Sequence, residues 1–482
     1  MNVKSTFILG LLCCLLVSFK PKSAIHLILK GKVEDENGKA ITGVMVTDGT
    51  NCVFTNASGK YLLESTNEAQ FVYITVPSGY EIPVLDHLAK FYVEIPQTSK
   101  ASFTANFKLS KLKQDDKHHF TVLWADPQIN NQDHADKLHQ QVVTDTRSHV
   151  AELLKIAPVT GISAGDISWD EPKMIAEYKK AVHATGIPFF QVLGNHDMDI
   201  NTRSDEKSDH TFKKSFGPSW YSFNRGNAHY IVLDNVFYYN NTYNYLGYIT
   251  EKQFKWLEQD LKAVKPGVPV FVSMHISAYT NEKSREQKEE DNQGKITFNR
   301  NYLYELLKPY QAHLLTGHTH YNENIIENGI YEHIHAAVCS AWWTGPVCED
   351  GTPGGYGVYE VNGDKVSWYY KSLGETRDFQ MKVYGLGIYK DRPKSITANV
   401  WNWDPQWIVR WYEDGKEMGG MKQITDFDAD AIKYLNASDK NTWMKARLTD
   451  HLFTATPSLE AKVVKIEVVD RFGTVYIKEI KI

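Results

Sequence analysis

The sequence predicts a central α/β domain between two smaller β-rich domains. In the middle of the chain, apolar runs of strand length alternate with helical stretches, whereas both flanks contain short alternating strands and turn signals. The length of 482 residues exceeds what a single hydrophobic core usually organises. A content of 42% hydrophobic residues can supply packed cores, which excludes a largely disordered chain.

The charge balance argues against one class of partner. The chain has 53 Lys and Arg against 58 Asp and Glu, a formal net charge of −5. Proteins that bind long nucleic acids usually carry a basic surface, so we expect no nucleic-acid polymer as a partner. Aromatic residues are numerous, with 12 Trp and 27 Tyr, and such rings either pack in cores or line ligand surfaces.

Residues 1–24 have the pattern of a secretory signal peptide. Lys4 supplies a positive start, and the run Phe7–Phe19 is apolar but too short to span a bilayer. No later segment has the length of uninterrupted apolar sequence that a transmembrane helix needs. We therefore expect a secreted or periplasmic protein without a transmembrane anchor.

Three cysteines follow this segment, at Cys52, Cys339 and Cys348. An odd number allows at most one disulfide bond within the chain. Cys339 and Cys348 are close enough in sequence to pair, and two free buried thiols are an equally acceptable interpretation. The absence of any Cys-x-x-Cys pair argues against a thiolate zinc site.

Residues 26–112 are expected to form a small β-sandwich. Apolar and polar residues alternate there, and the turn signals Asn37-Gly38 and Asp48-Gly49 interrupt the pattern. The Gly, Val and Asp run followed by Gly59-Lys60-Tyr61 resembles carboxypeptidase-regulatory-like domains. No cluster of metal-ligand or nucleophile residues occurs in this segment, so we expect it to act as a spacer or docking module.

Residues 117–372 are expected to form the α/β domain. Continuous apolar strands separated by helices are typical of a sheet that is covered on both faces. The expected strands lie at 120–124, 159–163, 189–193, 229–233, 268–274 and 312–316, and the clearest helices at 136–156, 172–185 and 251–264.

Residues 380–482 return to short β-like runs and are expected to form a second β-sandwich. Asp414-Gly415 and Phe472-Gly473 mark turns between these runs.

Polar residues of metal-ligand type follow five of the six central strands. In an open α/β sheet, ligands bind outside the carboxyl ends of the strands, so we expect these side chains to converge at one edge. They are Asp126 and Gln128, Asp166, then Asn195, His196 and Asp197, then His275, and finally His318 and His320.

This donor set suits two metal ions better than one. Asp, Asn and His offer oxygen and imidazole ligands, which fit manganese, iron or zinc rather than a structural zinc cage. This set of candidate ligands is too large for one tetrahedral ion but large enough for two ions that share a bridging carboxylate. Two adjacent metals can activate a water molecule and stabilise an in-line displacement, which is what phosphoester hydrolysis requires.

The motifs carrying these residues resemble those of calcineurin-like metallophosphoesterases. That family has Asp-x-His, Gly-Asp, Gly-Asn-His-Asp/Glu, a lone His and Gly-His-x-His in this order. The resemblance implies a two-sheet αββα sandwich, and the layout resembles bacterial members with an extra β-domain on each side. The matching residues are Asp126-Pro127-Gln128, Gly165-Asp166, Gly194-Asn195-His196-Asp197, His275 and Gly317-His318-Thr319-His320.

The resemblance also implies a role for each residue. Asp166 would bridge two metal ions, and His196 would contact the phosphate and protonate the leaving oxygen, oriented by Asp197. The first ion would be bound by Asp126, Gln128 and His320, and the second by Asn195, His275 and His318. Gln128 departs from the family pattern, which has His there, and its amide oxygen is a weaker ligand than imidazole.

The sequence therefore favours a secreted dinuclear-metal phosphoester hydrolase, with mono- and diesters not distinguished. Its substrate would be a phosphorylated small molecule, lipid, sugar or protein. Gln128 is the basis of an alternative, a catalytically weakened phosphoesterase that binds a cell-envelope partner through its β-domains. Trp169, Trp343 and Tyr356 lie on segments expected near the metals, so we expect them to shape substrate access, with ordinary packing as the other interpretation.

Overall fold

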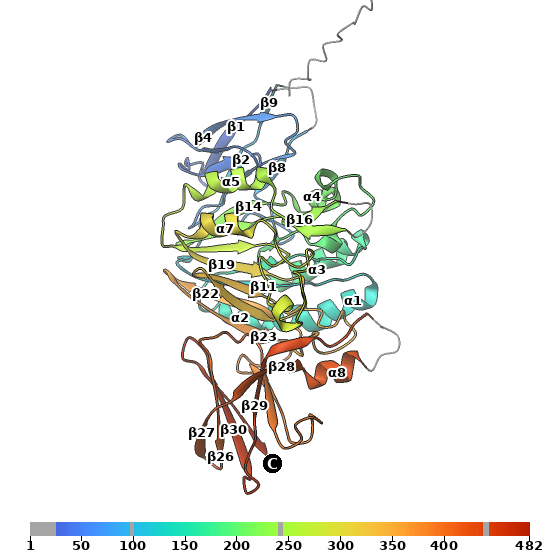
Figure 1. Cartoon of the computed structure of the whole chain (residues 1–482). Helices are drawn as coiled ribbons and strands as arrows, with labels where there is room; N and C mark the ends of the chain where they lie inside the picture. The colour runs from blue at the N-terminus through green and yellow to red at the C-terminus, as the bar shows by residue number, and fades with distance from the viewer. Residues whose placement is uncertain (1–25, 97–100, 240–243, 437–442) are drawn as a thin grey trace, which may run out of the picture.

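The computed structural model describes residues 26–96, 101–239, 244–436 and 443–482. Figure 1 shows three parts in a row, a β-rich N-terminal part, a central part with helices and sheets, and a β-rich C-terminal part. The predicted signal peptide, residues 1–24, lies outside the described residues. Among the helices that are described, none is both long enough and apolar enough to cross a membrane. The predicted domain boundaries stay predictions.

The N-terminal part is built from two four-stranded sheets. In one sheet β1 pairs with β4, β9 and β10, and the other has the order β3-β2-β5-β8. In β4, Tyr61, Leu63 and Ser65 are buried and the residues between them are exposed, as in a strand with one face on the core. The strands are β1 (His26–Asp35), β2 (Met45–Thr47), β3 (Cys52–Phe54), β4 (Lys60–Thr66), β5 (Phe71–Ile74), β8 (Tyr92–Glu94), β9 (Ser102–Thr104) and β10 (Phe107–Leu109).

The first central sheet has seven strands in the order β23-β22-β11-β12-β13-β7-β6. β11, β12 and β13 are parallel, as expected for strands joined by helices, whereas β22 and β23 pair antiparallel at one edge. A hairpin from the N-terminal segment, β6 and β7, completes the other edge. The strands are β6 (Val84–Leu85), β7 (Leu88–Ala89), β11 (His118–Trp124), β12 (Val159–Ser163), β13 (Phe189–Gln191), β22 (Gly355–Asn362) and β23 (Lys365–Ser372).

The second central sheet has six strands in the order β14-β15-β18-β19-β21-β20. Four neighbouring strands of this sheet are parallel: β15, β18, β19 and β21. Two further strands, β16 and β17, form a separate short antiparallel ribbon and are included in the bounds below. The strands are β14 (Tyr221–Arg225), β15 (Ala228–Val232), β16 (Val236–Tyr238), β17 (Tyr245–Gly247), β18 (Pro269–Ser273), β19 (Gln311–Thr316), β20 (Glu323–Glu327) and β21 (Ile330–Ile334).

The two central sheets pack face to face and carry helices on their outer faces. Leu123 and Ile162 of the first sheet share one apolar cluster with Phe271 of the second. The neighbouring Trp124 points to the opposite face and packs with α1, α2 and α3, while Trp256 of α5 packs on the second sheet. This order of layers is the αββα sandwich that the resemblance implied. The helices are α1 (Gln132–Lys137), α2 (Thr144–Leu153), α3 (Ile175–Thr185), α4 (His210–Phe216), α5 (Glu251–Leu261), α6 (Glu282–Arg285) and α7 (Arg300–Leu307).

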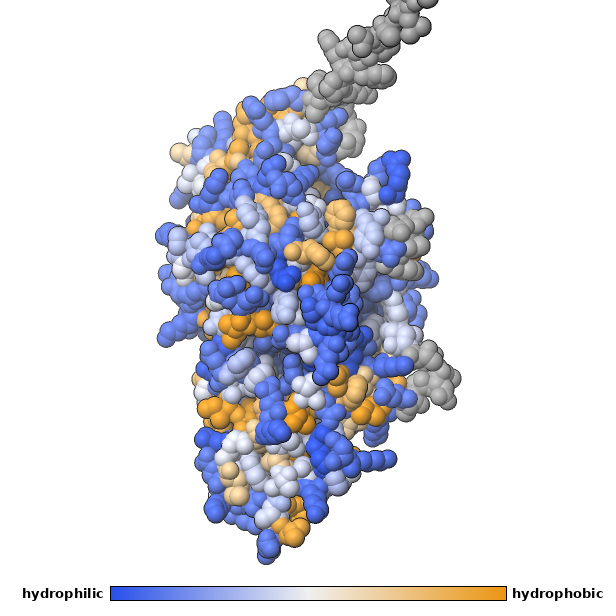
Figure 2. All heavy atoms as spheres, in the orientation of Figure 1, coloured by the Kyte–Doolittle hydropathy of each residue, from blue (hydrophilic) through white to orange (hydrophobic). Residues whose placement is uncertain are grey.

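The C-terminal part contains two further four-stranded sheets, β24-β25-β29-β28 and β27-β26-β30-β31, which share one apolar core. Helix α8 (Ala429–Leu435) begins after Asp428, whose carboxylate accepts hydrogen bonds from the first backbone N–H groups of the helix. Figure 2 shows a mostly hydrophilic surface on which apolar patches are scattered. The strands are β24 (Met381–Tyr384), β25 (Ile396–Val400), β26 (Ile408–Glu413), β27 (Lys416–Gly420), β28 (Lys422–Phe427), β29 (Leu448–Ala455), β30 (Val463–Val469) and β31 (Val475–Lys481).

Candidate metal centre

The polar residues that follow the central strands meet at one edge of the sandwich. Parallel strands within a sheet direct their carboxyl ends to the same side, so residues far apart in sequence come together there. They do not come from one sheet, because the sandwich divides them between two. The first sheet contributes Asp126, Gln128, Asp166, Asn195 and His196, and the second contributes His275, His318 and His320.

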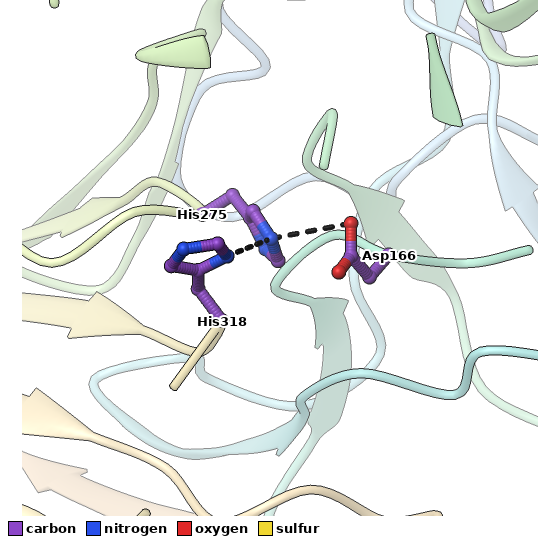
Figure 3. A group of neighbouring side chains, drawn as sticks. All are labelled: Asp166, His275 and His318. Atoms are coloured by element: carbon purple, nitrogen blue, oxygen red, sulfur yellow. Dashed lines mark hydrogen bonds and ion pairs between the residues drawn. The ribbon is translucent and has the colours of Figure 1, made fainter. Parts of the chain in front are cut away.

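One group of donors surrounds His275. Its Nε2 atom lies 3.2 Å from Asp166 Oδ1, 3.0 Å from Asn195 Oδ1 and 3.1 Å from His318 Nδ1. Figure 3 shows Asp166, His275 and His318 facing one another, and their ligand atoms all lie within 4.8 Å of one another. Two imidazoles, one carboxylate and one amide oxygen thus converge on a volume the size of a metal ion.

A second group lies on the other side of Asp166. His320 Nε2 is 3.6 Å from Asp126 Oδ1, and the Gln128 amide donates a hydrogen bond of 2.8 Å to Asp166 Oδ2. Asp166 therefore contacts both groups through its two oxygens. Within the described residues, Gln128 Oε1 and His320 Nε2 are buried atoms without a hydrogen-bond partner, an arrangement that is costly unless a ligand is bound.

Backbone carbonyls hold the histidine rings in place. His275 Nδ1 lies 2.8 Å from the Ala164 carbonyl oxygen, and His318 Nε2 lies 2.8 Å from that of Gly294. A nitrogen that donates to a carbonyl leaves the opposite ring nitrogen free as an acceptor, which is the usual arrangement of histidines that bind metals. The free nitrogens of both rings are the ones that face the donor group.

The glycines of the motifs allow these close approaches. A Cβ atom on Gly194 would lie 2.0 Å from the Asp166 backbone nitrogen, and one on Gly317 would lie 2.6 Å from Asp126 Oδ2. Any side chain there would displace a candidate ligand. The two motif glycines are therefore needed for packing of the donor loops.

Several candidate ligands have left-handed backbone conformations. Five of them have positive φ: 51° at Asp126, 41° at Gln128, 50° at Asp166, 70° at His318 and 51° at His320. Each such residue costs on the order of 1 kcal/mol or more, and it persists only where the surroundings enforce it. This concentration of strain is typical of functional sites.

The charge states of Asp126 and His320 also fit bound cations. Burial, with a contribution from Asp166, raises the pKa of Asp126 to about 8, so its ionised form needs a positive partner. Burial lowers the pKa of His320 to about 3, which keeps the imidazole in the neutral form that binds metals. Carboxylate, amide and imidazole donors suit manganese, iron or zinc. The residues present therefore fit the metal ions that the resemblance implied.

The structure corrects the expected partner of His196. Its Nδ1 atom lies 3.0 Å from both carboxylate oxygens of Asp170, a residue that the motifs did not single out. Asp197 instead accepts hydrogen bonds from the backbone N–H groups of Ile167, Ser168 and Gly194. The expectation that Asp197 orients the His196 ring is therefore wrong, because this carboxylate turns inward to tie two loops together. Although burial opposes it, the charges of Asp166 and Asp170 raise the pKa of His196.

A pocket of about 350 Å³ opens beside these donors. Of the three aromatic residues expected there, only Trp169 lines it. Trp343 is buried and donates from Nε1 to the Pro127 carbonyl, and Tyr356 is buried with its hydroxyl on Asp145. Those two expectations are wrong, since the loop directs Trp342 rather than Trp343 into the pocket. Trp443 and Arg447 of the C-terminal segment also line it, and no local motif indicated them.

None of the three cysteines in the described part of the chain lines the pocket. Cys52, Cys339 and Cys348 are all free thiols, so the disulfide interpretation of Cys339 and Cys348 is not realised. Both of these thiols are buried in the structure.

Comparisons with solved structures find distant similarities. A dimetal phosphatase from Danio rerio is 14% identical, with 53% of this chain and 97% of that chain covered and a TM-score of 0.37. The Plasmodium protein described as the anchor in the inner membrane complex is 14% identical, with 53% and 84% covered and a TM-score of 0.36. A putative 5′-nucleotidase from Staphylococcus aureus is 12% identical, with 53% and 54% covered and a TM-score of 0.33. Similarities of this extent carry no argument about activity.

Comparison with curated protein sequences gives no match. Three family models match the chain one after another. The N terminal of Calcineurin-like phosphoesterase matches residues 27–112, Calcineurin-like phosphoesterase matches residues 142–322, and the C terminal of Calcineurin-like phosphoesterase matches residues 332–476. These matches agree with the αββα sandwich and with the three-part organisation. The chain belongs to the calcineurin-like phosphoesterase family, in its form with additional N- and C-terminal domains.

Proposed function

We propose that this protein hydrolyses phosphoesters at a centre that would hold two metal ions, with Asp166 as the ligand that both ions would share. The observation that carries the proposal is the contact of Asp166 with two separate groups of donors, one of which contains two buried atoms without hydrogen-bond partners among the described residues. The first ion would be held by Asp126, Gln128, Asp166 and His320, and the second by Asp166, Asn195, His275 and His318.

The bound ions, manganese, iron or zinc, would activate a water molecule and neutralise charge on the phosphate. His196 would supply the proton for the leaving oxygen. Its Nδ1 is held by Asp170, so Nε2 is the nitrogen available to a substrate, and the residue lines the pocket. The His196 backbone N–H also donates to Asp166 Oδ1, which couples the position of the acid to the bridging carboxylate.

The dimensions of the pocket favour a small substrate. Its volume of about 350 Å³ lies at the lower end of the range for small-molecule sites. Residues of the central part and of the C-terminal part both line it. We expect walls from both parts to limit the size of the substrate, which favours a small phosphomonoester over a polymeric phosphodiester. Together with the predicted signal peptide, this supports a hydrolase exported to act on phosphorylated small molecules.

The proposal is tested by metal analysis and turnover. The purified protein is supplied with manganese, zinc or iron, and hydrolysis of p-nitrophenyl phosphate and of bis(p-nitrophenyl) phosphate is measured. We expect metal uptake and faster turnover of the monoester. Replacement of His196 by Ala should lower kcat by about 100-fold or more while metal content stays unchanged. Metal uptake without turnover of any ester would instead favour the binding-protein alternative.

A further inference from the structure

Three tryptophans, Trp169, Trp342 and Trp443, line the pocket together, and we name them the indole cluster. The ring of Trp443 lies 5.7 Å from that of Trp169 at 69° and 4.7 Å from that of Trp342 at 73°. An edge-to-face contact covers one face of only one ring, so the cluster keeps ring faces on which a ligand can stack. Trp443 is 51% exposed, although tryptophan side chains are on average highly buried in folded proteins.

The indole cluster lies where a leaving group would sit. Trp169 makes an edge contact with the His196 ring at 6.2 Å, and Trp342 stacks on the His320 ring at 4.2 Å and 19°. If His196 protonates the leaving oxygen, the rest of the leaving group extends past His196 and meets Trp169. The indole cluster therefore extends from the metal centre to the space that the leaving group occupies.

The segment that carries Trp443 is fixed to the central part. The Arg447 backbone N–H donates to the Glu349 carbonyl at 2.9 Å, and its guanidinium binds the Glu349 carboxylate. Met444 packs in an apolar cluster with Ala341, which precedes Trp342. These contacts place Trp443 in a defined position at the pocket rather than leaving it on a free surface.

The positive charges at the pocket are already neutralised. Arg447 contacts Glu349 and lies 3.4 Å from Glu286, and Lys295 forms an ion pair with Glu282. These carboxylates leave little positive charge for a second phosphate group on the substrate. The surroundings of the indole cluster therefore favour a leaving group without charge.

We infer that the indole cluster is a subsite that selects phosphomonoesters whose leaving group carries an uncharged ring with a flat apolar face. The inference rests on the proposed function, because it takes the direction of the leaving group from the role of His196. Aromatic rings and sugar rings both offer such a face, whereas an open-chain alcohol does not. Trp443 is the specificity residue of this subsite, contributed by the C-terminal part.

The test uses the full chain loaded with zinc or manganese and three monoesters, phenyl phosphate, a hexose phosphate and glycerol phosphate. Each variant is compared with the wild type on the same ester, so that the reactivity of the ester cancels. Trp443→Ala should lower kcat/KM for ring-bearing esters roughly tenfold, mainly through KM, and change glycerol phosphate hydrolysis by less than about twofold. Trp443→Phe should restore most of the loss, and the control Tyr434→Ala, an exposed aromatic residue of α8, should change nothing.

A loss confined to phenyl phosphate or to the hexose phosphate identifies which ring the subsite takes. An equal loss for all three esters, or no loss, overturns the inference while leaving the proposed function intact. A second measurement is independent of turnover: calorimetric binding of phenylphosphonate and methylphosphonate to the metal-loaded protein. Tighter binding of phenylphosphonate that Trp443→Ala abolishes supports the subsite even if no ester is hydrolysed. Equal binding of the two phosphonates, or no binding of either, overturns it.

Discussion

Replacement of Asp170 by Asn isolates the charge that holds the proposed general acid. Both Asp170 oxygens lie 3.0 Å from His196 Nδ1, and the side chains of His196 and Asp170 are only 24% and 19% exposed, respectively. The substitution preserves the backbone, because Asp170 has φ of 54° and Asn tolerates this left-handed conformation. The amide oxygen can still accept a hydrogen bond, so the ring stays in place while the negative charge is lost.

The size of the effect follows from the kind of bond. A hydrogen bond to a charged group contributes about 1.5–3 kcal/mol and a neutral one about 0.5–1.5 kcal/mol. Loss of the charge alone therefore costs about 1–1.5 kcal/mol, which corresponds to roughly 5- to 10-fold in rate. We expect Asp170→Asn to lower kcat by that factor with metal content unchanged. The loss should be larger for phenyl phosphate than for p-nitrophenyl phosphate, because the poorer leaving group depends more on protonation.

The assay compares kcat for the two aryl phosphates in wild type and variant, with metal content measured on the same samples. An equal loss for both esters would show that Asp170 does not act through proton donation. Loss of metal in the variant would show that it supports the centre itself. An unchanged kcat would refute the role of the contact between Asp170 and His196.

Three further predictions concern the donor loops and the core. Asp197→Asn should lower Tm and weaken metal retention, because an amide has only one oxygen to replace the two that accept from three backbone N–H groups. The free energy of unfolding should fall by about 1–3 kcal/mol, and an unchanged Tm would contradict this prediction. Gln128→His should slow metal loss in a chelator titration, and equal loss would show that Gln128 is not a ligand. His313 and His335 are buried, and burial lowers their pKa values to about 3 and about 4. Below a pH of about 6.5 the unfolded chain therefore binds more protons than the folded chain does. The free energy of unfolding should fall by about 2 kcal/mol per histidine by pH 5. His313→Phe should weaken this pH dependence, which is measured as Tm against pH.

Much of the fold and of the donor set could be predicted from local sequence. The stretches 120–124 and 159–163 contain no charged residue and no proline, which is typical of buried parallel strands, and the structure buries every residue in them. Each motif follows directly on its strand, so the strand itself delivers Asp126 and Asp166 to the sheet edge. That step needs only the direction of the strand and no knowledge of distant residues.

The partners of these residues could not be predicted in this way. Which carboxylate faces His196 depends on side-chain directions in tight turns: Asp197 adjoins His196 in sequence but points into the loop backbone, whereas Asp170 arrives from another loop. Trp342 and Trp343 are neighbours with left-handed φ of 46° and 64°, and only Trp342 lines the pocket, whereas Trp343 donates a hydrogen bond to the Pro127 carbonyl.

By itself, the sequence determined six of the central strands, the order of the donor motifs and the division into a central α/β part with β-rich flanks. These features arise from short-range patterns, apolar periodicity and residues placed where strands end. Only the tertiary structure decided that the donors come from two sheets and that the C-terminal part supplies Trp443 and Arg447 to the pocket. The physical reason is that packing between separate layers depends on the shape of whole surfaces, which no short stretch of sequence encodes.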